Sequence, residues 1–241
     1  TVFLQEVMVP HWVRGEKELA KIVNSKTIGS QEVPICALGG SIGTGDQGIT
    51  APIIEVQNFE ELAKLGKNAI EGKIVFFNRP MDATHIRTFH AYGGCVNQRG
   101  SGAIEAASYG AIGVVVRSMN LSQDDYPHTG AMGYKEGVKK IPACAISTNG
   151  ANLLSSMLKS QADLQFYFKM NCQTLPEVKS YNVVGEIRGR EFPKEIIVVG
   201  GHLDSWDNGD GAHDDGAGVV QSIEVLRIIK TKGVQPKRTI R

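Results

Sequence analysis

Short apolar runs alternate with amphipathic segments through the middle of the chain. Residues 73–77, 110–116 and 141–146 consist largely of apolar side chains and predict buried strands. Residues 102–109 and 149–158 follow two of these runs in the pattern of helices, and the second has a polar residue at its start to cap it. Residues 58–62 predict the start of a further helix, with the Asn58 side chain as its cap and two acidic residues in its first turn. Strands that alternate with helices predict a compact α/β unit.

The segments on either side of this region alternate apolar and polar positions instead. Residues 3–9 and 19–23 predict two strands joined as a hairpin, and residues 164–170 predict another strand. Residues 30–48 are rich in Gly, Ser and Thr and predict an irregular loop. Residues 176–180 predict a linker into a second domain.

The last part of the chain has a different pattern. Residues 195–201 are almost entirely apolar, as expected for a central strand that is buried on both faces. Residues 218–230 have apolar positions at helical spacing and predict an amphipathic helix. A strand followed by a loop and a helix is a common frame for a ligand site, which then lies at the carboxyl end of the strand.

Composition and charge exclude several functional classes. The 241 residues carry 26 basic and 25 acidic side chains, a formal net charge of +1, so no basic field for nucleic acid or for a lipid surface is present. No apolar run is long enough to span a membrane. The four cysteines form no CxxC pair and read as buried apolar residues, with one disulfide as the alternative in an oxidising compartment.

Chemistry-bearing residues gather directly after the apolar run at 195–201. His202 and Asp204 are two positions apart, so in an extended chain they point to the same side. Asp204 can then fix the imidazole so that its other nitrogen meets a metal, while Asp214 stands in a tight turn before the helix. Taken singly, such a histidine is more often a hydrogen-bonded residue, and such an aspartate a helix cap or turn residue. Their combined order favours a metal site.

The segment that contains them, GGHLDSWDNGDGAHDDGAG at 200–218, closely resembles the first half of an active site in the aminopeptidase and glutamate carboxypeptidase family of co-catalytic zinc exopeptidases. This resemblance implies two zinc ions per active site. By the family pattern His202 is a terminal zinc ligand, Asp214 bridges both ions, and Asp204 orients His202. Asp215 shapes the turn, which in this family often contains a cis peptide, and His213 is not a ligand.

A second resemblance covers the α/β unit. The order GKIVFFNRP, GAIEAASYGAIGVVVRS and IPACAIS is similar to a protease-associated domain, a small β-rich lid module without catalytic residues. The expected fold is therefore an α/β, phosphorylase/hydrolase-like zinc peptidase sheet, incomplete here, with an inserted protease-associated domain. The expected domains are 1–35, N-terminal strands of the peptidase region; 36–175, the protease-associated lid; and 176–241, the start of the zinc peptidase domain.

The resemblance also implies residues that this sequence does not contain. The family needs a Glu-Glu pair, an Asp and a late His after the next strand, and the chain has no Glu-Glu after position 61. We therefore expect an N-terminal part of a longer enzyme, inactive alone. The intact enzyme is expected to hydrolyse terminal bonds of short peptides, to be secreted or periplasmic, and to have a homodimer among its assemblies. The alternatives are a non-catalytic peptide-binding lid module and, on the glycine clusters alone, a glycan- or nucleotide-binding protein.

Overall fold

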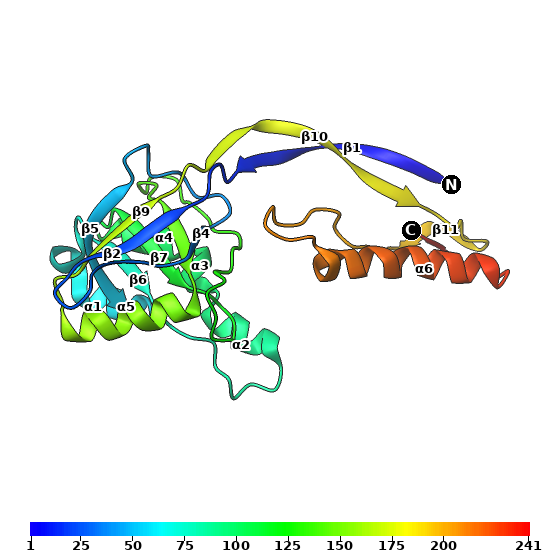
Figure 1. The fold of residues 1–241 in the computed structure, drawn as a ribbon. Helices are drawn as coiled ribbons and strands as arrows, with labels where there is room; N and C mark the ends of the chain where they lie inside the picture. The colour runs from blue at the N-terminus through cyan, green and yellow to red at the C-terminus, as the bar shows by residue number, and fades with distance from the viewer. The chain divides into compact units, whose positions relative to one another are not determined.

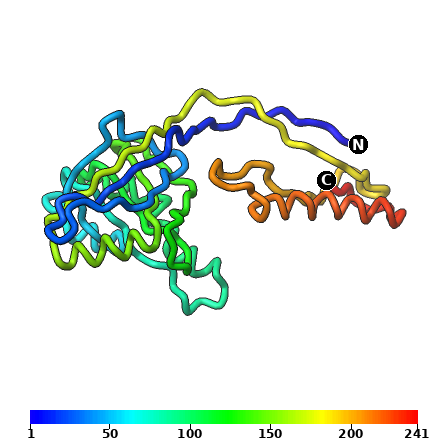
Figure 2. The backbone as a smooth tube through the Cα atoms, in the orientation of Figure 1, coloured from blue at the N-terminus to red at the C-terminus, as the bar shows by residue number.

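The computed structural model describes residues 1–241, which form two compact units. The central unit comprises residues 11–175, and the terminal unit comprises residues 1–10 together with 176–241. Figures 1 and 2 trace the chain through each of them. The structure thus places residues 11–35 in the same unit as residues 36–175. That this unit is a protease-associated domain stays a prediction.

An eight-stranded mixed sheet forms the middle of the central unit. Its strands, in sheet order, are β3 (Gly29–Glu32), β2 (Leu19–Ser25), β9 (Gln165–Lys169), β5 (Ile49–Val56), β6 (Ile74–Phe77), β7 (Gly113–Arg117), β8 (Ala143–Ile146) and β4 (Ile35–Ala37). The pairs β5–β6, β6–β7 and β7–β8 are parallel, and the remaining pairs are antiparallel. The predicted α/β class is confirmed.

Helices cover both faces of the parallel strands (Figure 1). Because side chains alternate along a strand, Ile74 and Phe76 pack into one core with α5 (Thr148–Ser160), whereas Val75 and Phe77 pack into a second core on the opposite face. The second core is closed by α1 (Phe59–Ile70) and α4 (Gly102–Ser108). Burial on both faces explains why these strands read as continuous apolar runs.

Side-chain caps fix the starts of the two longest helices in this unit. The Asn58 side chain accepts a hydrogen bond from the backbone N–H of Glu61 at 2.8 Å, as the sequence predicts for α1. Ser147 is fully buried and accepts from the N–H of Gly150 at the start of α5. Each cap satisfies a backbone donor that has no partner inside its helix.

A smaller apolar cluster lies apart from the two main cores. Its buried members include Met81, Cys95 and Met119, and it packs against α2 (Thr88–Cys95), which is followed by the single turn α3 (Asn97–Gly100). Ile86 and Phe89 in this region remain strongly exposed.

Three expectations from the sequence are wrong. The strand at 19–23 does not return from residues 3–9 as a hairpin, because β2 pairs with β3 and β9. The segment 30–48 is not wholly irregular, since most of β3 and all of β4 fall within it. The third, a linker at 176–180, is wrong only in its local structure: the segment lies inside a long strand, β10 (Gln173–Gly185), whereas the predicted passage into a second domain coincides with the boundary between the two units at Pro176.

The terminal unit has little sheet of its own. The strand β1 (Val2–Val13) pairs with β10, and β11 (Phe192–Ile197) pairs in parallel with β12 (Arg238–Ile240). The helix α6 (Ala217–Thr231) begins one residue before the predicted helix and ends one residue after it. No helix of the structure combines the length and the apolar character that crossing a membrane requires.

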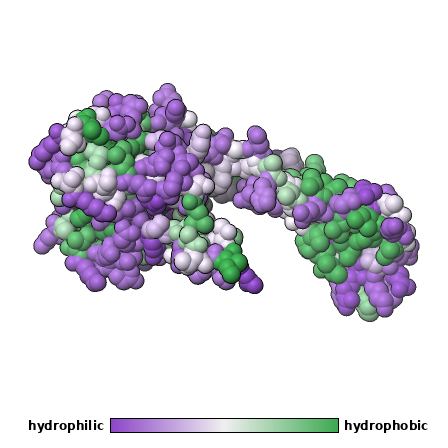
Figure 3. Space-filling model, turned by 60° about the horizontal axis from the view of Figure 1, so that its bottom comes forward, coloured by the Kyte–Doolittle hydropathy of each residue, from purple (hydrophilic) through white to green (hydrophobic).

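The predicted burial of the apolar run at 195–201 is wrong for this unit. Ile196 is 42% exposed and Val198 is 71% exposed. The physical reason is that a two-stranded sheet and one helix cannot cover both faces of a strand. Val220 and Ile223 of α6 are also exposed, and apolar side chains accordingly gather at the surface of this unit in Figure 3.

Candidate metal centre

The predicted site residues lie in the terminal unit, between β11 and α6. His202 and Asp204 stand in the irregular segment after β11, and Asp214 and Asp215 belong to one π-helical turn, η1 (Ala212–Gly216), that leads directly into α6. The turn is not regular, because Asp214 (φ −118°, ψ 90°) departs from helical backbone angles. The connection therefore brings two segments together at the carboxyl end of β11.

His202 contacts both predicted aspartates through opposite nitrogens of its ring. Its Nε2 lies 3.0 Å from Oδ1 of Asp214. Its Nδ1 lies 2.9 Å from the backbone oxygen of Asp204 and 3.3 Å from Oδ1 of the same residue. With its proton on Nδ1, the ring donates to Asp204 and presents the Nε2 lone pair toward Asp214.

These acceptors also act on the protonation of the histidine. The hydrogen bond to the backbone oxygen of Asp204 raises the pKa of His202, and the Asp214 carboxylate raises it further. Both effects favour the protonated form of the ring over the neutral form.

The Asp214–Asp215 peptide bond is cis, as the family resemblance implies. The two carboxylates face different partners. Asp214 faces the His202 ring, whereas Asp215 accepts from the backbone N–H of His202 through Oδ2 at 3.1 Å and from the N–H of Gly218 through Oδ1 at 3.1 Å.

Sequence reasoning assigned Asp215 to the turn and missed these two bonds. The signal that could have found them is the pair of glycines at 201 and 218. A Cβ atom on Gly218 would lie 2.3 Å from Oδ1 of Asp215, and one on Gly201 would lie 2.7 Å from Oδ2. Neither glycine is needed for a left-handed backbone. Gly218 is explained by the room that the carboxylate takes, and Gly201 by the carboxylate together with the backbone of Val219.

The pair of His202 and Asp214 has the donor chemistry of a zinc site but is incomplete. An imidazole nitrogen and a carboxylate oxygen are zinc ligands, and both side chains are accessible, at 51% and 85% exposure. No group of three or more His, Cys, Asp and Glu side chains is arranged so that all of them could hold one metal ion. The residues thus fit two ligands of a metal site.

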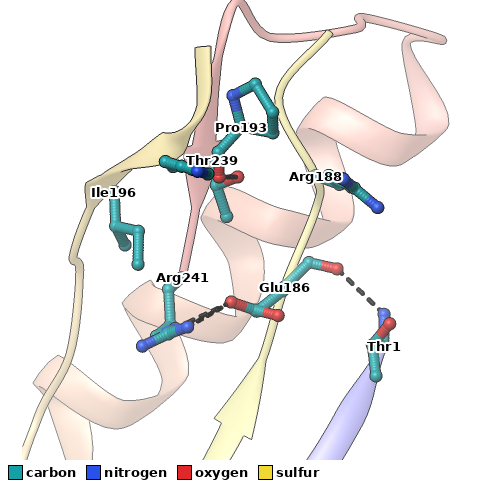
Figure 4. Close-up of a pocket in the computed structure, with 8 residues that line it drawn as sticks. Thr1, Glu186, Arg188, Pro193, Ile196, Thr239 and Arg241 are labelled. Atoms are coloured by element: carbon teal, nitrogen blue, oxygen red, sulfur yellow. Dashed lines mark hydrogen bonds and ion pairs between the residues drawn. The ribbon is translucent and has the colours of Figure 1, made fainter.

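A separate cleft of about 410 Å³ lies in the same unit and contains none of the predicted site residues. Figure 4 shows the carboxylate of Glu186 facing the guanidinium of Arg241, and the amine of Thr1 facing the Glu186 backbone oxygen. Arg188 and Lys194 also line the cleft. Its chemistry is that of an ion-paired surface.

The comparisons with known proteins define the class first. The sequence pattern of the family described as "Peptidase family M28" matches residues 182–241, and this range contains His202 and Asp214. Residues 182–241 are therefore similar to this peptidase family, in keeping with the predicted resemblance.

Similarity to individual proteins extends over the whole chain, beyond residues 182–241. The chain is 42% identical over 240 residues to carboxypeptidase Q of Xenopus laevis, covering 100% of this chain and 48% of that protein. The chain thus spans about half the length of the curated relatives it matches.

Solved structures of peptidases are also similar to the whole chain. The crystal structure of a peptidase M28 precursor from Shewanella amazonensis SB2B is 36% identical with a TM-score of 0.89, and the match covers 100% of this chain and 53% of that one. A zinc aminopeptidase from Bacillus subtilis is 20% identical with a TM-score of 0.60, covering 99% and 49%. The second likeness shows the fold alone.

Proposed function

We propose that this chain forms part of a zinc-dependent exopeptidase that removes terminal residues from short peptides. The single observation that carries the proposal is the convergence of His202 Nε2 and Asp214 Oδ1, in a segment that matches a peptidase family. Carboxypeptidase Q and the zinc aminopeptidase, by their names, support a metal-dependent exopeptidase.

Each residue has a distinct part in the proposed site. His202 would hold zinc through Nε2, Asp204 holds the ring by its contact with Nδ1, and Asp214 would bind through its carboxylate. The family resemblance implies two zinc ions per site, and Asp214 would then be the residue that both ions share. Bound zinc supplies an acidified water and polarises a carbonyl oxygen.

The number of zinc ligands in this chain determines the zinc affinity and the activity expected of the chain alone. Catalytic zinc sites take three protein ligands and an open position, and this chain supplies two. We therefore expect weak zinc binding and no peptide hydrolysis from this chain alone. Residues 36–175 are proposed to be the protease-associated lid, the site to lie in a secreted or periplasmic protein, and a homodimer to be among its assemblies.

Zinc binding measured by competition with a low-affinity chromophoric chelator, matched to a weak site, tests the proposal. The unaltered chain is expected to compete, and H202A and D214A to lose this ability. H213A is the matched control, because His213 is exposed beside Asp214 and has been assigned no ligand role. Equal binding by all four proteins, or none by the unaltered chain, would contradict the proposal. Absence of zinc binding by the unaltered chain would favour the alternative, a non-catalytic peptide-binding module.

A further inference from the structure

The carboxylate of Asp215 joins the two halves of the candidate metal centre. Its Oδ2 accepts from the backbone N–H of His202 and its Oδ1 accepts from the N–H of Gly218, each at 3.1 Å. One side chain thus links the segment after β11 to the start of α6. A carboxylate accepts such bonds at both oxygens, whereas the isosteric Asn side chain has only one acceptor oxygen.

The location of these two donors matters for the metal ligands. His202 itself supplies the first, and Gly218 stands at the second position of α6, where backbone N–H groups have no partner inside the helix. A negative charge there is also stabilised by the helix dipole. Asp214 precedes Asp215 directly, so both predicted ligands are tied to the same carboxylate through the backbone.

The surrounding sequence makes room for this arrangement. Gly201 precedes His202, and a Cβ atom there would meet the backbone nitrogen of Val219 at 2.6 Å and Oδ2 of Asp215 at 2.7 Å. A Cβ on Gly218 would meet Oδ1 at 2.3 Å. The two chain segments therefore approach closely around the carboxylate, as a specific link requires.

We propose that Asp215 is the positioning residue of the metal centre: it holds the His202 backbone against the start of α6, so that Nε2 of His202 and the Asp214 carboxylate converge. The inference rests on the proposed function where it takes His202 and Asp214 to be zinc ligands. Asp215 does not touch the ion or the substrate in this account. Its part is to set the distance between the two groups that do.

Nuclear magnetic resonance tests the link without any metal. In zinc-free buffer, the amide groups of His202 and Gly218 are each expected to show a coupling across the hydrogen bond to the side-chain carbon of Asp215. His202 is expected to occupy a single χ1 rotamer. In D215A the couplings vanish and the rotamers of His202 average. D215N, with one acceptor and one donor, is expected to keep only one of the two bonds.

D210N is the matched control. Asp210 is an exposed carboxylate in the same segment between β11 and α6, and its replacement by Asn removes one negative charge, as D215N does. It is expected to keep both couplings and the single rotamer. Unchanged amide signals of β11, β12 and the second half of α6 show that the terminal unit of each variant is folded. Absent couplings in the unaltered chain, or an unchanged single rotamer in D215A, would overturn the inference.

A zinc titration of the same proteins separates this inference from the proposed function. D215A is expected to bind zinc about 10–100-fold more weakly than the unaltered chain, the usual effect of losing an outer partner of a ligand. D210N is expected to stay within about twofold of it. Failure of the unaltered chain to bind zinc would contradict the proposed function, whereas equal affinity in D215A would contradict the positioning role.

Discussion

Oδ1 of Asp214 lies 3.0 Å from Nε2 of His202, although the two residues are 12 positions apart in the chain. The contact depends on the turn at Ala212–Gly216, which carries the chain back to the end of β11 before α6 begins. The central claim of the proposed function is that this contact marks a shared cation.

Replacing Gly218 with alanine is expected to destabilise the terminal unit. Alanine is favoured over glycine inside helices by about 1 kcal/mol, so helix propensity alone predicts the opposite result. The added Cβ would lie 2.3 Å from Oδ1 of Asp215 and must displace it. Thermal unfolding followed by the signals of α6 measures the change. A higher melting temperature for G218A would contradict this account of the carboxylate.

G233A is not a suitable control for that experiment, because Gly233 has a positive φ of 64° and alanine is strained there. S222A is the better one. Ser222 lies on α6 and bonds only the Gly218 oxygen, so its loss is expected to change the unfolding free energy by about 0.5 kcal/mol or less.

Truncating Phe76 is expected to destabilise the central unit by about 3–5 kcal/mol, because the ring is fully buried in a core between β6 and α5. Urea unfolding of F76A against the unaltered chain measures the loss. F89A is the matched control, since the Phe89 ring is strongly exposed and its removal is expected to change stability by about 0.5 kcal/mol or less. Comparable losses in both variants would show that the core is assigned wrongly.

Stability is expected to fall at alkaline pH because of buried thiols. Burial raises the pKa of Cys172 to about 11, and it also raises the pKa of Cys144 well above its ordinary value. An unfolded cysteine loses its proton near pH 8.5, whereas the folded one keeps it. The contribution of the buried, protonated Cys172 thiol to the free energy of unfolding is therefore complete below about pH 8.5 and is lost as the pH rises toward 11.

The free energy of unfolding in urea, measured between pH 8 and pH 10.5, checks this expectation. The reducing agent is kept constant, since all four cysteines are buried and in the thiol form. C172S does not titrate in this range and is expected to show a shallower fall. An identical slope in C172S and in the unaltered chain would assign the alkaline loss to other groups.

The sequence predicts the central unit well wherever local and tertiary preferences agree. The apolar runs at β6, β7 and β8 are continuous because helices cover both faces, and Asn58 marks the start of α1 by a cap that needs only local contacts. The partner of β2 was predicted wrongly because strand pairing is decided at long range. Its partner β9 lies more than a hundred residues later.

The candidate site could be predicted in its residues but not in its distances. His202, Asp204 and Asp214 are recognisable from their order after an apolar strand, and the structure brings all three together. The two hydrogen bonds that Asp215 accepts from the backbone could not be predicted from the sequence, because they depend on how closely the two segments approach each other. The exposure of Ile196 was missed for a similar reason, since burial depends on which layers cover the strand.

The ¹⁵N chemical shift of His202 Nε2 during a zinc titration tests the central claim most directly. The account predicts a large shift of Nε2 that reverses when a chelator is added, with the Asp214 carboxylate carbon shifting alongside it and the His213 ring unchanged. A titration that leaves the His202 ring nitrogens unmoved, or that shifts His213 instead, would contradict the account.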